Sequence, residues 1–372
     1  MRTLRVLAPA ILAFVVACLA AAGAAAQTPG STVVARGLDN PRGLTFGSAG
    51  GLYIAEAGRG GSGPCIGQGE MRFCYGSTGA VTAVVRGRQY RLATGLPSVA
   101  LANGVEAVGP ADLSSSGPGK RLQVVIGWIP GGTAASRAAL GRFGQRFARL
   151  VRLTADPRES RFLWDLGAFE AAANPDGAAL ETNPWALVSE PQRNIVVDAA
   201  GNSLLLVPAH GPISTLATFA PRPALAPPFL GLPPGAMIPM DSVPDSITRG
   251  PDGAYYVGEL TGFPFPVGAA RVYRVVPGQA PTVFAEGFTN IIDLAFDRAG
   301  NLYVLEHTTR GLLSRDPAGA VVRVAANGTR TTVASAGLVN PTGLAIGPDG
   351  ALYVSNRGTS ARTGEVLRIS LG

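Results

Sequence analysis

The residues best suited to chemistry in this chain are acids that recur at two places in a repeated phrase of sequence. Four of them end a strand-like apolar segment, and two lie three positions into the segment before it. These six candidate metal ligands are Glu56, Glu106, Asp198, Glu259, Asp293 and Glu306. Because carboxylate oxygens are preferred ligands of hard divalent cations, the set predicts Ca²⁺ or Mg²⁺ as the cofactor. The alternative is structural, because strand-end acids commonly accept hydrogen bonds from backbone N–H groups.

Amide and aromatic side chains that could contact an organic ligand accompany these acids. Five asparagines stand where a strand begins, and three aromatic residues lie beside them or in a Pro-rich loop. The candidate ligand-binding residues are Asn40, Asn103, Asn183, Trp185, Phe263, Phe265, Asn290 and Asn340. An aromatic floor suits a planar ligand, and amides suit a polar one. The structural alternative is that the asparagines cap turns with their side chains and that the rings hold their own loops.

Catalytic side chains are scarce. The chain has two histidines, of which His307 follows Glu306 and is the candidate base, whereas His210 lies in a predicted turn. No Gly-x-Ser-x-Gly motif of a serine hydrolase occurs. The first hypothesis is therefore a non-enzymatic protein that binds a ligand or partner. The competing hypothesis is a metal-dependent enzyme of lactonase or oxidoreductase type that uses the same acids.

A repeated phrase positions these groups. An apolar run, a Gly-containing turn and a second apolar strand recur, and the second strands end at Glu259, Glu306 and Asn356, which are 47 and 50 residues apart. This is the period of a four-stranded propeller blade. A blade leaves one sheet face bare, so only a closed ring of blades buries a core.

Six blade openings can be counted along the chain. They are Asn40-Pro41, Asn103-Gly104, Asn183-Pro184, Val243-Pro244, Asn290-Ile291 and Asn340-Pro341. The last blade has three strands of its own, and a segment like a fourth strand, Thr32–Leu38, precedes the first blade. The sequence thus predicts an all-β, six-bladed β-propeller of the NHL/TolB-like kind, with the N-terminal strand closing the last blade.

Strand direction predicts where the loops and the candidate residues lie. The longer insertions follow the second and fourth strands, so they gather on one face, which we name the upper face. They cover residues 57–79, 129–148, 167–182, 220–242, 260–270 and 307–319. Insertions on one side of a repeat fold are typical of its binding face. We expect the acids and asparagines at the upper mouth of the central channel.

The N-terminus predicts export. Arg2 and Arg5 precede an apolar stretch and Ala24-Ala25-Ala26, so residues 1–26 are expected to be a signal peptide and 27–372 the propeller domain. The mature protein is then secreted or periplasmic and has no transmembrane segment. The alternative is lipoprotein anchoring through Cys18. The two remaining cysteines, Cys65 and Cys74, predict a disulfide.

Charge constrains the partner. The formal net charge is +7, but the arginines form no sustained basic tract and are not interleaved with aromatic residues. Nucleic acid is therefore not expected as a partner. The expected partner is a small molecule or an extracytoplasmic protein, bound by a monomer.

Two stretches resemble the ScyD/ScyE family. One contains Gly262-Phe263-Pro264-Phe265-Pro266 and runs to Phe296, and the other joins Asn174-Pro175-Asp176-Gly177 to Asn183-Pro184 and Val196–Asn202. The resemblance covers essentially the whole mature chain. It implies an exported protein with degenerate NHL-type propeller repeats, and founding members act in late, extracytoplasmic steps of the scytonemin sunscreen pathway of cyanobacteria. It implies no particular catalytic residue.

Overall fold

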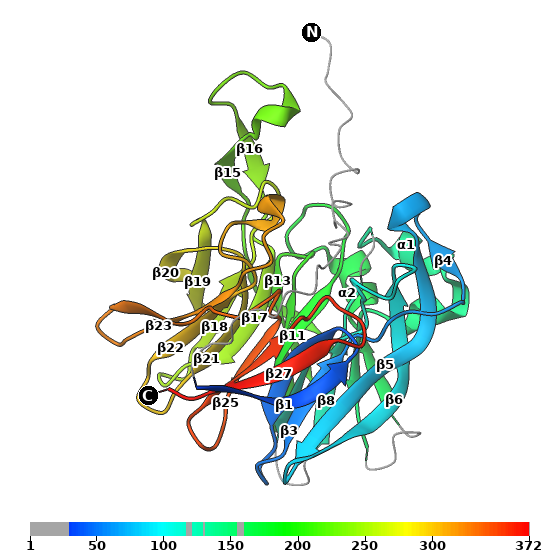
Figure 1. Ribbon diagram of the computed structural model, residues 1–372. Coiled ribbons are helices and arrows are strands. Elements are labelled where there is room, and N and C mark those ends of the chain that lie inside the picture. The colour runs from blue at the N-terminus through cyan, green and yellow to red at the C-terminus, as the bar shows by residue number, and fades with distance from the viewer. Residues whose placement is uncertain (1–29, 117–120, 129–130, 155–159, 372) are drawn as a thin grey trace.

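A ring of six antiparallel sheets makes up the protein (Figure 1). The structure is a computed structural model that describes residues 30–116, 121–128, 131–154 and 160–371. The innermost strands contact one another in a closed order, β2–β7–β11–β17–β21–β25 and back to β2. The predicted six-bladed β-propeller is confirmed. The predicted signal peptide at 1–26 and Cys18 lie outside the described residues.

Four strands form the body of each blade, running outward from the channel. Blade one contains β2 (Pro41–Phe46), β3 (Leu52–Glu56), β5 (Phe73–Val85) and β6 (Arg88–Ala100), with the short β4 (Cys65–Ile66) paired to β5. Blade two contains β7 (Pro110–Ser116), β8 (Arg121–Ile126), β9 (Arg149–Arg152) and β10 (Arg161–Asp165). Blade three contains β11 (Pro184–Glu190), β12 (Arg193–Asp198), β13 (Ser203–Pro208) and β14 (Ser214–Thr218).

The second half of the ring repeats this order. Blade four contains β17 (Pro244–Arg249), β18 (Tyr255–Glu259), β19 (Ala270–Val275) and β20 (Thr282–Phe288). Blade five contains β21 (Ile291–Phe296), β22 (Leu302–Glu306), β23 (Ala320–Val324) and β24 (Arg330–Ala334). Blade six contains β25 (Gly343–Ile346), β26 (Leu352–Asn356), β27 (Gly364–Ile369) and, as its outer strand, β1 (Ser31–Leu38).

The N-terminal strand closes the ring, as the sequence predicts. β1 pairs antiparallel with β27, from Ser31 opposite Ile369 to Leu38 opposite Gly364. Without β1, the outer edge of β27 would present unpaired backbone groups, which is the usual aggregation liability of a sheet. The closure therefore completes both the hydrogen bonding of blade six and the ring.

The core lies between adjacent blades. Every residue of β22 is buried, from Leu302 to Glu306, because this second strand has neighbours within its sheet and a blade against each face. Apolar clusters accordingly span blade boundaries; one joins Tyr256 and Val272 of blade four to Leu294 and Val304 of blade five. Each blade thus buries its faces only against its neighbours in the ring.

The predicted opening of blade two at Asn103 is wrong. The inner strand β7 begins at Pro110, and the end of β6 continues into an antiparallel bridge between Val99 and Val108. Residues 101–107 therefore form a loop between blades. Gly109 occupies the place of Asn40, since its carbonyl accepts from the N–H of Gly127 as that of Asn40 accepts from Ala57.

Most of the remaining elements lie in the upper-face insertions. They are α1 (Ala134–Ala139), α2 (Leu166–Ala173), the 3₁₀ turns Gly69–Met71, Gly141–Arg146, Pro228–Leu230 and Leu312–Ser314, and a hairpin of β15 (Arg222–Leu225) and β16 (Met237–Met240). The predicted disulfide joins Cys65 to Cys74 and links β4 to β5. Within the described residues, no helix has the length and apolar character needed to cross a membrane.

Candidate functional site

Four of the predicted metal ligands hold the ends of second strands in place. We name Glu56, Asp198, Glu259 and Glu306 the strand-end acids. Three of them accept from the backbone N–H just before an inner strand: Asp39 to Glu56 (2.7 Å), Asn183 to Asp198 (2.6 Å) and Thr289 to Glu306 (2.7 Å). In blade six the amide oxygen of Asn356 replaces the acid and accepts from Val339 (2.7 Å). The shared position therefore has a shared structural task, in which a side chain ties one strand to the next connection.

Further partners surround these carboxylates. Glu56 accepts from the Thr82 hydroxyl (2.5 Å) and is paired with Arg91 (3.0 Å). Glu259 accepts from the Ser242 hydroxyl (2.7 Å) and is paired with Arg222. Burial raises the pKa of Asp198, Glu259 and Glu306, and their hydrogen bonds oppose that rise.

The six predicted metal ligands are consequently not one cluster. In the part of the chain that the structure describes, no group of three or more His, Cys, Asp or Glu residues could hold a metal ion by itself. Each strand-end acid has hydrogen-bond partners at the end of its own second strand or in the adjoining connection. Glu106 and Asp293 instead lie in the channel region.

The asparagines at blade openings are also structural. Asn40, Asn290 and Asn340 have φ angles of 50°, 44° and 40°, a left-handed conformation that asparagine tolerates better than most residues. Their side chains bond neighbouring loops; the amide of Asn40, for example, donates to the carbonyls of Gly58 and Gly104 (both 2.8 Å). Asn183 Oδ1 accepts from Trp128 N (3.1 Å), whereas Asn103 is exposed in the loop before blade two.

Four acids occupy the channel region, and sequence reasoning identified only two of them. We name Glu106, Asp112, Asp245 and Asp293 the channel acids. Asp112 and Asp293 are the third residues of β7 and β21, and Asp245 is the second residue of β17. Counting from Gly109-Pro110 as from Asn40-Pro41 would have found Asp112 at the position that Asp293 holds in blade five.

Burial raises the pKa of all four channel acids, and repulsion by a neighbouring acid adds to this rise at Asp112 and Asp245. Burial and the charge of Asp293 raise the pKa of Asp112 well above its usual value; burial and the charges of Asp293 and Glu259 do the same for Asp245. Burial raises the pKa of Asp293 to about 7, although the N–H groups of Leu344 (2.6 Å) and Leu294 (2.7 Å) donate to it. Oδ1 of Asp245 is buried and has no partner among the described residues.

A buried arginine lies among these acids. Arg42, the second residue of β2, is 6% exposed, donates to the carbonyl of Ala107 (2.8 Å) and lies over the ring of Trp185 (5.3 Å). Because Trp185 belongs to blade three, the Arg42 side chain reaches across from blade one. Burial lowers the pKa of Arg42 to about 10, opposed by Glu106, and burial raises the pKa of Glu106 to about 7, opposed by Arg42.

The structure gives His307 a satisfied, neutral ring. Its Nδ1 lies 2.8 Å from the carbonyl of Pro341, which can only accept, so Nδ1 carries the proton. Its Nε2 then accepts from the amide of Asn340 (3.3 Å). Burial, with the charge of Arg42, lowers the pKa of His307 to about 4. Both ring nitrogens are engaged, so His307 is poorly placed to act as a base.

The predicted aromatic residues are in two separate places. Trp185 faces Arg42 in the channel region. Phe263 and Phe265 pack edge to face with each other (6.2 Å) in the upper loop of blade four, and Phe263 contacts Phe229 of the β15–β16 connection (6.2 Å). The two phenylalanines therefore belong to the upper surface rather than to the channel.

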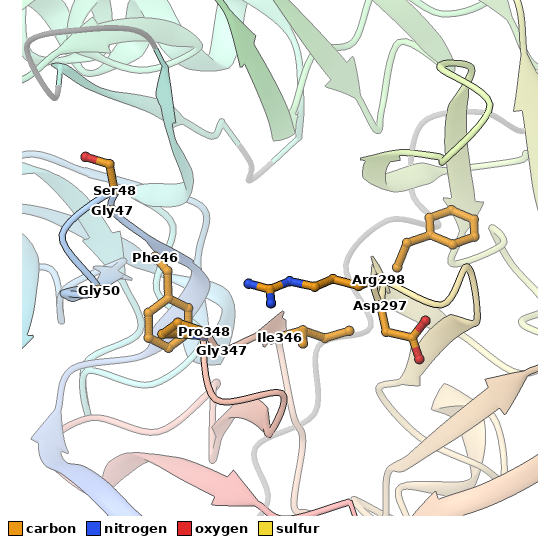
Figure 2. Close-up of a pocket in the computed structure, with 10 residues that line it drawn as sticks. Phe46, Gly47, Ser48, Gly50, Asp297, Arg298, Ile346, Gly347 and Pro348 are labelled. Carbon is orange, nitrogen blue, oxygen red and sulfur yellow. The ribbon is translucent and has the colours of Figure 1, made fainter.

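A cavity of about 340 Å³ opens at the lower mouth. It is lined by the turns between first and second strands of blades one, five and six, and Figure 2 shows Arg298 extending into it toward Phe46. The residues that line it are 46–48, 50, 296–298 and 346–348. None of the candidate residues predicted from the sequence lines this cavity.

Comparison with known proteins gives the fold alone. No family model matches the chain, and no curated protein matches it. A solved structure named glucose dehydrogenase is 15% identical and has a TM-score of 0.52, with 92% of this chain and 100% of that chain covered. A gluconolactonase from Xanthomonas campestris is 10% identical, with a TM-score of 0.52 and coverage of 91% and 89%. The calcium-binding protein regucalcin from Agrobacterium tumefaciens is 14% identical, with a TM-score of 0.50 and coverage of 93% and 94%. These likenesses support the six-bladed β-propeller fold, and the neighbouring structures belong to the NHL/SMP-30 class of propellers.

Proposed function

We propose that the protein is an exported binding protein of the ScyD/ScyE type that takes a small molecule or an extracytoplasmic protein at its upper face. A hydrated Ca²⁺ or Mg²⁺ in the channel is part of the proposed site. The observation that carries this proposal is the set of channel acids, whose pKa values are raised by burial and, for Asp112 and Asp245, by the charge of Asp293. A bound cation would relieve that repulsion.

The donor set suits a hard cation. The channel acids supply carboxylate oxygens, and Oδ1 of Asp245 is buried without a partner among the described residues. The described residues contain no group of three acids or histidines arranged to hold a bare ion. A cation that keeps part of its water shell needs fewer direct protein ligands, and Mg²⁺ in particular retains several waters. Asp245 and Asp293 are the residues that would hold it.

Melting measurements test the cation. Protein in Ca²⁺ or Mg²⁺ should melt at a higher temperature than protein in EDTA, since a ligand at a hundredfold excess over Kd stabilises the folded state by about 2.7 kcal/mol. Asp245→Asn should abolish the shift. Glu286→Gln, which changes an exposed acid on β20, should retain it. A wild-type protein that is metal-free on elemental analysis and melts identically in all three conditions contradicts the cation site.

Tryptophan fluorescence tests the upper-face ligand. Trp185 lies beside Arg42, so a small molecule entering the upper channel should change its emission. A screen of small polar and planar compounds should yield fluorescence titrations that Trp185→Phe eliminates. Arg298→Ala at the lower mouth should leave them unchanged. If Arg298→Ala eliminates the fluorescence titrations, the ligand binds at the lower face instead.

A metal-dependent enzyme of lactonase or oxidoreductase type is the second candidate. The observation that favours it is Glu106, whose pKa of about 7 suits a general base near neutral pH. The neighbours named gluconolactonase and glucose dehydrogenase share the fold, which by itself does not transfer an activity. This candidate predicts turnover of a lactone or sugar that EDTA and Glu106→Gln abolish and His307→Gln largely spares. If no lactone or sugar in a panel is turned over, the enzyme candidate is contradicted and the binding protein is the remaining candidate.

A further inference from the structure

The β15–β16 hairpin projects from the upper face and contains no polar side chain along most of its length. It stands above the ring, between blades three and four (Figure 1). From Pro223 to Met240 the chain consists only of Ala, Leu, Pro, Phe, Gly, Met and Ile, which is 18 residues without a charge or a hydrogen-bonding side-chain group other than the weak sulfur acceptors of Met. No other upper-face insertion in the sequence has this composition.

The large apolar side chains of this hairpin face outward. Phe229 is 69% exposed, Leu225 65%, Met237 54% and Leu232 46%. Scattered exposed apolar residues are normal on a protein surface and need no explanation. Here they are gathered on one projecting element, and such concentration marks an interaction surface.

The backbone of the hairpin tip is also unusually poor in free donors. Four of the eleven residues from 226 to 236 are prolines, which have no N–H: Pro227, Pro228, Pro233 and Pro234. Four further N–H groups are bonded inside the tip, those of Ala226, Leu230, Gly231 and Ala236. In a hydrocarbon medium each unsatisfied backbone group costs several kcal/mol. A tip with few free donors therefore suits the interfacial region of a membrane, where water can donate to its free carbonyls.

Basic and apolar residues flank the hairpin on the same face. Phe229 contacts Phe263 in the loop of blade four, and Gly311 in the loop of blade five lies against Phe265 and Val267. Val267 is 64% exposed and Leu313 40%. Arg310 and Arg315 are exposed in the blade-five loop, where Arg310 pairs with Asp316 (3.3 Å). An apolar projection beside exposed arginines is typical of a surface that enters the membrane interface and contacts anionic headgroups.

We propose that the β15–β16 hairpin docks the propeller on an anionic lipid membrane, with Phe229 and Leu232 entering the interfacial region and Arg310 and Arg315 lying at the headgroups. Without Arg2 and Arg5 of the predicted signal peptide, 29 basic residues remain against 24 acids, and this net charge of +5 complements such a surface. The base of the hairpin is tied to blade four, because Arg222 pairs with Glu259 and donates to the carbonyl of Ala269 (3.1 Å). This docking goes beyond the channel site and does not depend on it.

Vesicle cosedimentation tests the docking. Wild-type protein should bind vesicles containing phosphatidylglycerol more tightly than vesicles of phosphatidylcholine alone. Phe229→Ser with Leu232→Ser should lower the partition coefficient by about tenfold or more, the factor expected for removing a large side chain from an apolar medium. Arg310→Ala and Arg315→Ala should each reduce the preference for anionic vesicles by about fivefold.

A matched control lies on blade four. Val283 and Phe284 are 46% and 44% exposed on the outer strand β20, so Val283→Ser with Phe284→Ser removes a similar exposed pair elsewhere. This control and the channel variant Asp245→Asn should both bind vesicles as the wild type does. The hairpin variant should melt within a few degrees of the wild type, because its tip lies outside the six blades.

Two results would overturn the docking. One is the absence of wild-type binding to either kind of vesicle, and the other is an equal loss of binding in the β20 control. Self-association that only the hairpin variant loses, without vesicle binding, would assign the hairpin to a second copy of the chain.

Discussion

The strand-end acid Glu56 and the channel acid Asp245 have the same carboxyl chemistry and opposite surroundings. Glu56 is fully buried and accepts from a backbone N–H, a hydroxyl and an arginine. Asp245 is 3% exposed, and one of its oxygens has no partner among the described residues. The difference arises from position in the blade. The end of a second strand adjoins the connection to an inner strand and its N–H groups, whereas the first residues of inner strands meet across the channel.

The comparison teaches that acids in this fold range from clamps, such as Glu56, to unbalanced charges, such as Asp245. Asp112 and Asp293 lie between the two, because backbone N–H groups donate to them. A clamp stabilises the ring because hydrogen-bond donors and, at Glu56 and Glu259, an arginine compensate its charge. An unbalanced charge destabilises the ring unless a proton, Arg42 or a cation compensates it. Substitutions should therefore have opposite signs in the two groups.

Removing a clamp should have the largest effect. Glu56→Ala leaves the N–H of Asp39, the hydroxyl of Thr82 and the guanidinium of Arg91 without their acceptor. We expect a loss of about 3–5 kcal/mol in the free energy of unfolding, measured by urea denaturation. The exposed pair of Glu286 and Arg271 offers a control, and Glu286→Ala should change stability by less than about 1 kcal/mol. Similar losses at both sites would remove the distinction between a clamp and an ordinary surface acid.

Neutralising a channel acid should instead stabilise the protein. In EDTA at pH 8, Asp245→Asn should increase the free energy of unfolding by about 1–2 kcal/mol, since it removes a charge that faces Asp293 and Glu259. The pKa of Asp245 is raised in the folded state, so folding favours its protonated form. The stability of the wild type should thus fall as pH rises above about 4, and the gain in the variant should vanish below that pH. A destabilised Asp245→Asn at pH 8 in EDTA would contradict the unbalanced charge.

Neutralising Glu106 should also stabilise the protein, but by less than neutralising Asp245. Its pKa is about 7 in the folded state against 4.5 in an unfolded chain, so its contribution to stability is present below pH 4.5 and lost as pH rises to about 7. Arg42 offsets part of its charge. Melting temperature followed from pH 4 to 8 should therefore fall less steeply in Glu106→Gln than in the wild type. Parallel curves would show that Glu106 does not titrate in this window.

A substitution at the lower mouth should have the smallest effect on stability. Arg298 is exposed and lines the lower cavity, away from both sets of acids. Arg298→Ala should alter the free energy of unfolding by less than about 0.5 kcal/mol and leave its pH dependence unchanged. A pH profile altered by this change would extend the electrostatic coupling through the whole channel.

The sequence predicted the six-bladed ring correctly because the motif that indicates a blade is local and is repeated along the chain. A turn, a Tyr-containing strand and a closing acid recur, and the echo of a fourth strand at Thr32–Leu38 indicated the closure that β1 makes with β27. The position of blade two was harder to predict. Asn103-Gly104 imitates an opening, while the true one at Gly109-Pro110 lacks the asparagine.

The site was less predictable because its geometry depends on the closed ring. Whether Glu56 faces the channel or its own connection depends on which N–H groups surround it, and a strand pattern does not contain that information. Arg42 follows Asn40-Pro41, and nothing in that motif predicts its role. Its contact with Trp185, two blades away, exists only after the ring has formed. The upper-face insertion at 220–242 was evident from its length, whereas the projection of its hairpin was not.

The pairing of β1 with β27 also determines when the ring can close during synthesis. The first strand of the ring has no partner until the residues around Ile369 have been made, about 340 residues later. At synthesis rates of about 5–20 residues per second, β1 waits roughly 20–70 s in an unpaired state. During that interval the edge of β1 that pairs with β27 in the ring is open to other strands, which is the usual aggregation liability of a sheet edge. A chain that ends between Ala334 and Gly364 contains all the strands of blades one to five, but it lacks the strand that pairs with β1.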